Sequence, residues 1–155
     1  MTAIEPVAIR RARRDDVGII VAMLADDPLG SARERIDQPL PATYFRAFET
    51  LEHDPNIRLV VAEQGGAVIG CLQLCILAGL SSQGASRALI EDVRVARHCR
   101  SRGVGEQLVQ WAMTEARAAG CKLVELLTHN TRIDAQRFYK RLGFQPSHVG
   151  MTHRF

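Results

Sequence analysis

The sequence contains few lysines, few aromatic residues and no apolar run long enough to cross a membrane. Of its 20 basic residues only Lys122 and Lys140 are lysines, and aromatic residues make up 5% of the chain. The longest nearly uncharged stretch, 67–86, contains glycines, serines and two glutamines, which make it too polar for a transmembrane helix. A nucleic-acid surface requires basic residues spread along one face with stacking aromatics. We therefore expect neither a membrane nor a nucleic acid as partner, and interpret the basic run 10–14 as a solvated strand end and helix entry.

Metal-binding and redox motifs are also missing. The four cysteines, Cys71, Cys75, Cys99 and Cys121, form no CxxC pair, and the five histidines lack a metal-binding spacing such as HExxH. We therefore expect no metal, and interpret the cysteines as small, buried, apolar side chains. Because the first residues lack a basic segment followed by an apolar one, we expect a cytoplasmic protein with reduced thiols.

Composition and patterning indicate one α/β domain spanning residues 1–155. Hydrophobic residues make up 46% and charged residues 24%, ordinary proportions for a globular domain, and the formal net charge is +3. Apolar alternation and turn residues predict strands at 7–10, 57–63, 67–77, 87–95 and 122–128. Helical spacing predicts helices over 17–24, 44–51, 103–119 and 134–143, the last capped by Asp134. Prolines and a glycine predict a loop over 28–41, and we expect strand-like pieces over 144–155. This alternation is typical of a layered α/β fold.

A basic, glycine-containing loop joins the strand at 87–95 to the helix that begins at Gly103. It reads Arg97-His98-Cys99-Arg100-Ser101-Arg102-Gly103-Val104-Gly105. The first turn of a helix leaves N–H groups unpaired and carries about half a positive charge, and glycines let an anion approach the backbone closely. The loop therefore predicts a phosphate or pyrophosphate site.

Two better-known phosphate motifs are absent. No Gly-Lys pair occurs, which excludes the P-loop, and Leu108 stands where the dinucleotide fingerprint requires its third glycine. What remains is Arg-x-x-Gly-x-Gly from Arg100 to Gly105. Since an ordinary tight turn with surface arginines could read the same way, the flanking strand and helix are what favour an anion site.

The chain resembles the GNAT superfamily of acetyl-CoA-dependent N-acetyltransferases, whose signature [Q/R]-x-x-G-x-[G/A] lies between the fourth strand and the third helix. Three segments carry the resemblance in the right order: 90–95 with the loop after it, Asn130, and 134–144. Within the family, the stretch 134–148 is similar to aminoalkylphosphonate acetyltransferases. The resemblance covers essentially the whole chain and implies a single-domain GNAT fold, with a mixed sheet of about six to seven strands flanked by about four helices.

The resemblance implies acetyl-CoA as cosubstrate and suggests which residues hold it. Backbone groups of the fourth strand, at Val93, Arg94 and Val95, would pair with the pantetheine arm. The pyrophosphate would be held by N–H groups of the loop, which belong to Arg100, Ser101, Arg102, Gly103, Val104 and Gly105. Asn130, Phe138 and Tyr139 would lie beside the pantetheine arm and the thioester. In this family the fourth and fifth strands splay apart to admit the cofactor.

Two residues are candidates for proton transfer. Tyr139 matches the family tyrosine that protonates the leaving thiolate; its alternative role is a core residue that packs a helix against the sheet. Glu91 is our expected base for the amine, with Asp92 or a water chain as alternatives, because a β-bulge expected nearby makes strand parity unreliable. The two acidic residues could instead be solvated or salt-bridged near Arg94 and Arg137.

The expected reaction is acetyl transfer from acetyl-CoA to a primary amine of a small molecule, by direct attack in a ternary complex. A non-catalytic acetyl-CoA-binding sensor and a protein or peptide N-acetyltransferase are the alternatives. We expect the acceptor site to be built from 29–43, 78–87 and the C-terminal segment. An anionic group on the amine would suit four residues of the first and last of these, Arg33, Arg35, His148 and His153. Because an exposed sheet edge is usually covered, the terminal segment 149–155 leads us to expect a homodimer.

Overall fold

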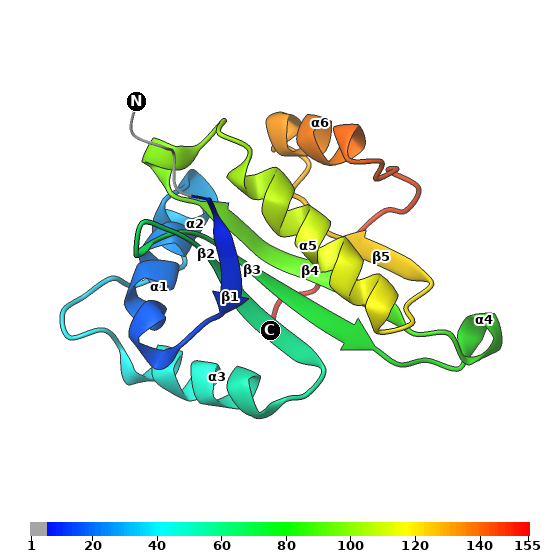
Figure 1. Cartoon of the computed structure of the whole chain (residues 1–155), viewed down its shortest axis with the longest axis horizontal. Helices are drawn as coiled ribbons and strands as arrows, with labels where there is room; N and C mark the ends of the chain where they lie inside the picture. The colour runs from blue at the N-terminus through cyan, green and yellow to red at the C-terminus, as the bar shows by residue number, and fades with distance from the viewer. Residues whose placement is uncertain (1–5) are drawn as a thin grey trace.

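The computed structural model describes residues 6–155, which form a mixed five-stranded sheet covered by helices on both faces (Figure 1). The strands lie side by side in chain order, and each is antiparallel to its neighbour except that β4 and β5 run parallel. They are β1 (Ala8–Arg11), β2 (Ile57–Gln64), β3 (Ala67–Leu77), β4 (Arg87–Val95) and β5 (Leu123–Leu126). The two edges of the sheet are therefore β1 and β5.

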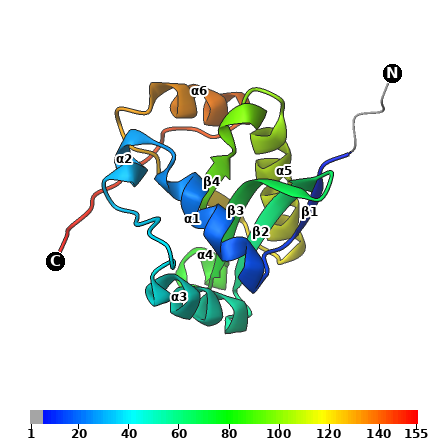
Figure 2. The ribbon, with the colours of Figure 1, turned by 90° about the vertical axis from the view of Figure 1, so that its left-hand side faces the viewer.

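The helices lie in two layers. Helices α1 (Val17–Ala25) and α3 (Ala42–His53) cover one face of the sheet, and α5 (Val104–Ala118) covers the other (Figure 2). Helix α6 (Ile133–Arg141) follows β5 and lies beside the first turn of α5. The shorter elements are the one-turn helices α2 (Pro28–Ser31) and α4 (Ser81–Gly84) and the 3-10 turns η1 (Arg14–Asp16) and η2 (Arg97–Cys99).

Apolar stripes on the helices bury the sheet from both sides. Leu108 and Ala112 of α5 are fully buried against it, and Trp111 packs at the margin of the same cluster. On the other face Ile20 of α1 contacts the cluster that includes Cys71 of β3. Each burial of a large aliphatic side chain contributes roughly 1.5–3 kcal/mol, so the two clusters fix the sheet between its helical layers.

The strand count differs from the expectation. β3 and β4 have the predicted bounds, but the sheet contains five strands rather than six to seven, because the segment 144–155 forms none. A strand requires a hydrogen-bonded neighbour, and no other part of residues 6–155 pairs with this segment. β5 also ends at Leu126 rather than at Thr128, because beyond Leu126 the chain leaves β4.

Two helix boundaries also needed correction. The predicted loop 28–41 begins with α2, whose first N–H groups are capped by the Asp27 carboxylate. Arg132, rather than Asp134, occupies the N-cap position of α6. Asp134 lies inside the first turn, where a carboxylate still interacts favourably with the positive end of the helix.

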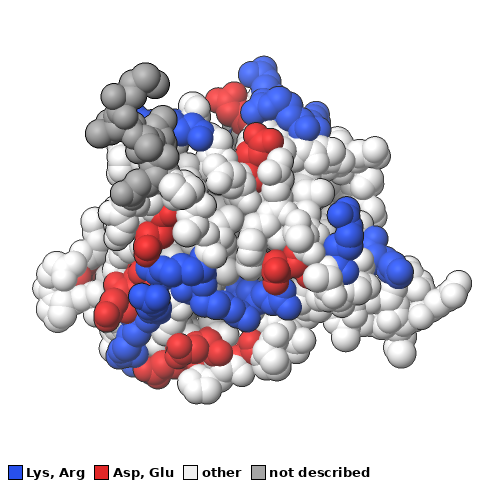
Figure 3. Space-filling model, in the orientation of Figure 1, with Lys and Arg blue, Asp and Glu red and all other residues white. Residues whose placement is uncertain are grey.

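The arginines near the N-terminus are mostly exposed, as expected, and two of them also pair with carboxylates of the chain. Arg10 binds the carboxylates of Asp16 and Glu63, and Arg14 binds Glu49. Figure 3 shows acidic and basic side chains interleaved on this face of the molecule. Hydrogen bonds from the Arg10 guanidinium hold the pKa of Asp16 below its ordinary value, so this buried carboxylate stays ionised. Within residues 6–155, no helix is both long and apolar enough to cross a membrane.

Gly30 is a position where the fold depends on the absence of a side chain. A Cβ there would lie 1.9 Å from the carbonyl oxygen of Leu24, so α2 would have to move. We expect Gly30→Ala to lower the free energy of unfolding by about 1–3 kcal/mol. In Gly18→Ala the new Cβ has no atom within 4 Å, and we expect stabilisation by about 0.5–1 kcal/mol because alanine favours α1. Urea denaturation measures both, and equal stability of the two variants would contradict the expectation.

Candidate active site

A cavity opens where β4 and β5 part. Their pairing begins at Arg87 and Leu123 and stops at Ile90 and Leu126, while β4 continues to Val95. A cavity of about 740 Å³ follows, lined by this part of β4, the segment after β5, the loop before α5, and α6. The parting that the family resemblance implied is therefore present, and it leaves the β5-facing edge of β4 without a strand beside it.

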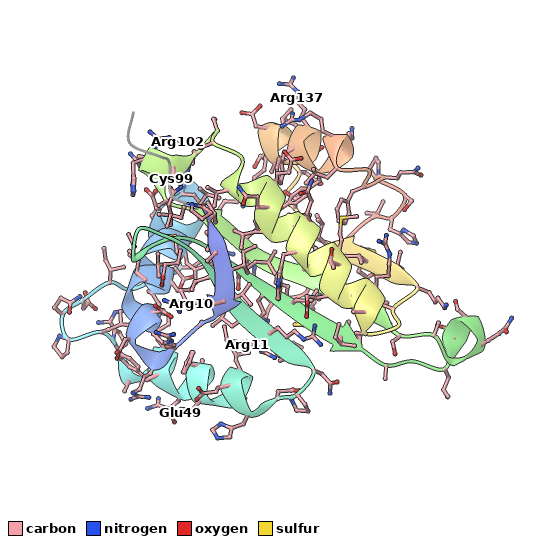
Figure 4. The ribbon with its side chains drawn as sticks, viewed as in Figure 1. Arg10, Arg11, Glu49, Cys99, Arg102 and Arg137 are labelled. Carbon is pink, nitrogen blue, oxygen red and sulfur yellow. The ribbon has the colours of Figure 1, made fainter. Side chains whose placement is uncertain are left out.

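At one end of the cavity lies the loop that precedes α5. Ser101 and Gly103 have left-handed backbone conformations, with φ of 62° and 80°, and Gly103 is the N-cap of α5. The backbone turns there so that Val104 and Gly105, the first residues of the helix, line the cavity. A Cβ added at Gly103 would meet no atom within 4 Å, so the space in front of this turn is open. Figure 4 shows Cys99 and Arg102 on the segment that leads into the helix.

Two charged side chains of this loop already form hydrogen bonds with other groups of the chain. Arg100 donates to the carbonyl of Val95 at 3.1 Å and to the Asp26 carboxylate at 2.9 Å, and Arg97 binds the other Asp26 oxygen at 2.6 Å. These bonds hold the loop against the end of α1. The capacity of the loop to bind an anion therefore rests mainly on its backbone N–H groups and the helix N-terminus.

Helix α6 forms the opposite wall with two aromatic side chains. Phe138 lies 3.5 Å from the position a Cβ would take at Gly105, and its ring meets that of Tyr139 edge to face at 5.0 Å. Burial raises the pKa of Tyr139, and the nearby charges of Arg132 and Arg94 act in the opposite direction. The phenol therefore stays protonated at neutral pH and is able to donate a proton into the cavity.

A β-bulge places Glu91 and Arg94 on the same face of the sheet. Gln73 pairs with Glu91 but Cys71 pairs with Arg94, so β4 contains one more residue than β3 between these positions. Asp92 accommodates the extra residue by adopting a left-handed backbone conformation, with φ of 52°. In a regular strand residues three apart point to opposite faces. The bulge therefore brings a carboxylate and a guanidinium to the face that α1 covers.

Glu91 lies among polar groups of β3. Its Oε2 accepts a hydrogen bond from Gln73 Nε2 at 3.1 Å, and the Cys75 thiol lies 3.7 Å from the same oxygen. Burial raises the pKa of Cys75, so the thiol remains neutral. The Glu91 carboxylate is exposed and borders the cavity, and no ion pair joins it or Asp92 to Arg94 or Arg137 in the described part of the chain.

Most of the sequence-derived site residues border this one cavity. The lining includes Glu91, Val93, Arg94, Val95, Arg100, Ser101, Gly103, Val104, Gly105, Phe138 and Tyr139. Arg102 and Asn130 are exposed and do not line it; the carbonyl of Asn130 accepts a hydrogen bond from Gln136 at the start of α6. Residues 6–155 contain no group of three His, Cys, Asp or Glu side chains placed to hold a metal ion.

The residues expected to attract an anionic acceptor do not border the cavity. Arg33 and Arg35 line a separate hollow beside Tyr44. His148 and His153 are exposed on the terminal segment. These four residues therefore lie apart from the cavity that holds the other predicted site residues, and their role towards an acceptor stays a prediction.

Sequence reasoning missed a cluster beside the cavity, formed by Asp27, Arg94 and Arg132. Asp27 Oδ1 accepts from the N–H groups of Leu29 and Gly30, both at 2.8 Å. Its Oδ2 lies 3.6 Å from Arg94 Nη2 and 3.7 Å from Arg132 Nη2. Burial opposes ionisation, but these donors and cations together hold the pKa of Asp27 below its ordinary value. The only sequence signal was the Asp-Pro pair at the start of α2, which predicts a cap rather than a site.

Comparison with known proteins agrees with this geometry. Residues 21–144 match the family described as the acetyltransferase (GNAT) family. The chain is 32% identical over 145 residues to the aminoalkylphosphonate N-acetyltransferase of Salmonella typhimurium, covering 93% of this chain and 88% of that one. The crystal structure of a transcriptional regulator from Bacillus halodurans C-125 superposes with a TM-score of 0.94 at 45% identity, over 97% of this chain and 100% of that one.

A more distant structure shares the fold. An aminoglycoside N-acetyltransferase solved in complex with CoA superposes with a TM-score of 0.80 at 16% identity, over 100% of this chain and 98% of that one. The family match spans most of the chain and includes the parted strands, the loop before α5, and α6. The chain therefore belongs to the GNAT acetyltransferase family and is an acetyl-CoA-dependent acetyltransferase.

Proposed function

We propose that the enzyme transfers the acetyl group of acetyl-CoA to a primary amine of a small molecule, by direct attack in a ternary complex. The observation that carries this proposal is the continuous cavity, which joins the anion-binding turn at Gly103 to Tyr139 and Glu91. The similarity to an aminoalkylphosphonate N-acetyltransferase supports a small amine as acceptor.

The residues of the cavity suit acetyl-CoA. The N–H groups from Arg100 to Gly105 would hold the pyrophosphate, and the open edge of β4 at Val93 and Val95 would pair with the amide groups of the pantetheine arm as a further strand would. Phe138 supplies an apolar wall for the arm. This arrangement would bring the thioester to the end of the cavity that Tyr139 borders.

Two proton transfers would complete the reaction. An alkylammonium resembles lysine, with a pKa of about 10.4, so presenting it as the neutral amine at pH 7 costs roughly 4–5 kcal/mol. Glu91 is the proposed base that accepts this proton, directly or through water. The amine nitrogen then attacks the thioester carbon, the carbon–sulfur bond breaks, and Tyr139 donates its proton to the departing thiolate. The proton that the nitrogen loses as the amide forms passes through solvent and restores the Tyr139 phenol.

The pyrophosphate assignment predicts the effect of Gly103→Asp. The new side chain strains a left-handed backbone position and brings a negative charge to the proposed anion site. We expect acetyl-CoA binding, measured by calorimetry, to be abolished. Gly66→Asp is the matched control, because Gly66 also has φ of +77° and open surroundings but lies in the turn between β2 and β3. Unchanged affinity in Gly103→Asp would show that the loop does not hold the pyrophosphate.

The two proposed proton-transfer residues should respond differently to pH. Tyr139→Phe removes only the hydroxyl, and we expect turnover to fall by about 100- to 10,000-fold with little change in acetyl-CoA affinity. Glu91→Gln should regain activity as pH rises towards the pKa of the amine, because free amine then forms without help. Tyr139→Phe should not recover in this way. The measurement is thiol release across a pH series.

Other outcomes of this series reassign the roles. A wild-type pH profile in Glu91→Gln would move the base to Asp92 or to a water chain. Near-normal turnover in Tyr139→Phe would leave that tyrosine a packing residue. Absence of thiol release with any amine, despite acetyl-CoA binding, would favour a non-catalytic sensor, an alternative made pertinent by the relative described as a transcriptional regulator. Acetylation of peptide amines alone would favour a protein or peptide acetyltransferase.

The terminal segment supports a homodimer. Val149, Met151 and Phe155 are 88%, 91% and 117% exposed, and they alternate with Gly150, Thr152 and Arg154 as the residues of a half-buried strand would. Figure 2 shows this segment projecting away from the body of the molecule. Burying such apolar side chains would contribute roughly 1.5–3 kcal/mol each. We propose that a second copy covers them, and that the four free thiols belong to a cytoplasmic enzyme.

The dimer predicts a mass in solution. We expect light scattering to give twice the chain mass of 17.2 kDa at tens of micromolar. A variant that ends at Pro146 should be monomeric and keep its circular dichroism, because the segment removed pairs with no strand of its own chain. A mass near 17.2 kDa for the full chain would rule out the dimer.

A further inference from the structure

Two arginines from distant parts of the chain meet beside Tyr139. Arg94 reaches this place from the bulge of β4, and Arg132 from the segment that precedes α6. Both line the cavity, and the charges of both act on the Tyr139 hydroxyl. The cluster contains two guanidinium groups and one carboxylate, Asp27, so it carries one positive charge in excess.

The pairing of these arginines is unusually loose for this molecule. Several exposed pairs are tight, with N–O distances of 2.6 Å between Arg14 and Glu49 and 2.9 Å between Arg100 and Asp26. Arg94 is only 12% exposed, yet its nearest carboxylate oxygen is 3.6 Å away, and Arg132 is 3.7 Å from the same oxygen. Both distances are too long for a hydrogen bond.

Polar atoms of the cluster lack partners. Arg94 Nη1 donates to its neighbour's carbonyl, but neither Arg94 Nε nor Asp27 Oδ2 has a hydrogen-bond partner within residues 6–155, although both atoms are buried. An unsatisfied buried polar group costs about 1–3 kcal/mol, and more when it is charged. Of the two atoms, Arg94 Nε is the donor, and it lacks an acceptor that an acidic ligand would supply.

The cosubstrate does not supply that acid. Under the proposed function its phosphates are held by N–H groups of the turn from Arg100 to Gly105, and the pantetheine arm carries no charge. The positive charge beside Tyr139 is therefore available to bind the acceptor substrate.

We propose that Arg94 and Arg132 bind an acidic group, a phosphonate, phosphate or carboxylate, carried by the acceptor amine. Asp27 is a positioning residue that holds the two guanidinium groups apart from each other and aimed at one point. The acceptor is thus a short amine with an acidic tail, a class that contains aminoalkylphosphonates and amino acids. This inference rests on the proposed acetyl transfer and replaces Arg33, Arg35, His148 and His153 as the source of anion recognition.

The test compares an acid with its neutral ester. Aminopropylphosphonate and its diethyl ester have the same amine and the same chain length, and aminobutyrate with its ethyl ester provides the carboxylate pair. In Arg132→Gln we expect KM for the acids to rise by about 10- to 100-fold, the loss of one charged hydrogen bond, with KM for the esters unchanged. For Arg132→Lys, KM for the acids should lie between the values of the wild type and of Arg132→Gln, since lysine keeps the charge but not the paired donors of the guanidinium.

Arg137→Gln is the control variant. Arg137 lies on α6 too, but it is 70% exposed, does not line the cavity, and points away from the sheet in Figure 4. We expect Arg137→Gln to leave KM unchanged for both the acids and the esters. If Arg132→Gln lowers kcat equally for acids and esters, the arginines act on Tyr139 alone and the proposal is wrong. The proposal is also wrong if the wild-type enzyme has the same KM for the esters as for the acids.

A binding measurement separates this proposal from the catalytic one. Propylphosphonate has the acidic group but no amine, so its binding to the CoA complex does not depend on acetyl transfer. We expect calorimetry to detect binding to the wild-type chain and to Arg137→Gln, and a loss of at least about tenfold in Arg132→Gln. Equal binding to all three, or none to the wild type, would overturn the arginine site. Failure of every amine to release thiol would instead overturn the proposed function while leaving this binding result intact.

Discussion

The early end of the β4–β5 pairing is the constraint on which the rest of the site depends. β5 has four residues and β4 has nine, and the two strands are paired only from Arg87 to Ile90. Past that point β4 has a strand on one side only, and its other edge faces the cavity. Backbone N–H and C=O groups require partners when they are buried, so an open strand edge inside a molecule suits a ligand with amide groups of its own. The same parting lets α6 approach the first turn of α5, which closes the cavity over Tyr139.

The bulge in β4 adds a second constraint on this open edge. It changes the alternation of side chains at the middle of the strand, so that Glu91 and Arg94 share the face covered by α1, whereas Val93 and Val95 pack towards α5. A strand without the bulge would place either the carboxylate or the guanidinium in the apolar core. The left-handed conformation of Asp92, which is unfavourable for residues other than glycine, is stabilised by the strand pairing on either side of it.

The two arginine clusters beside the cavity have the same ratio of charges but differ in how tightly they are paired. At the loop before α5, Arg97 and Arg100 share the Asp26 carboxylate at 2.6 Å and 2.9 Å. Beside Tyr139, a single carboxylate faces two guanidinium groups at distances beyond hydrogen bonding. Asp26 and Asp27 are neighbours at the end of α1, so one short segment sets the electrostatic balance of both clusters. The steric tightness at Gly30 fixes that segment against α1.

The sequence by itself determined the elements with local causes. The bounds of β3 and β4 and the start of α5 at a positive-φ glycine follow from alternation, helical spacing and turn residues, which act between near neighbours. The terminal segment 149–155 alternates as a strand does, yet forms none, because strand formation also requires a partner edge. Only the tertiary structure decided where β5 leaves β4, which face Glu91 shares with Arg94, and that Asp27 and Arg132 meet there. Those features depend on contacts between segments far apart in the chain. The identity of a single residue does not indicate which distant segment of backbone it will approach.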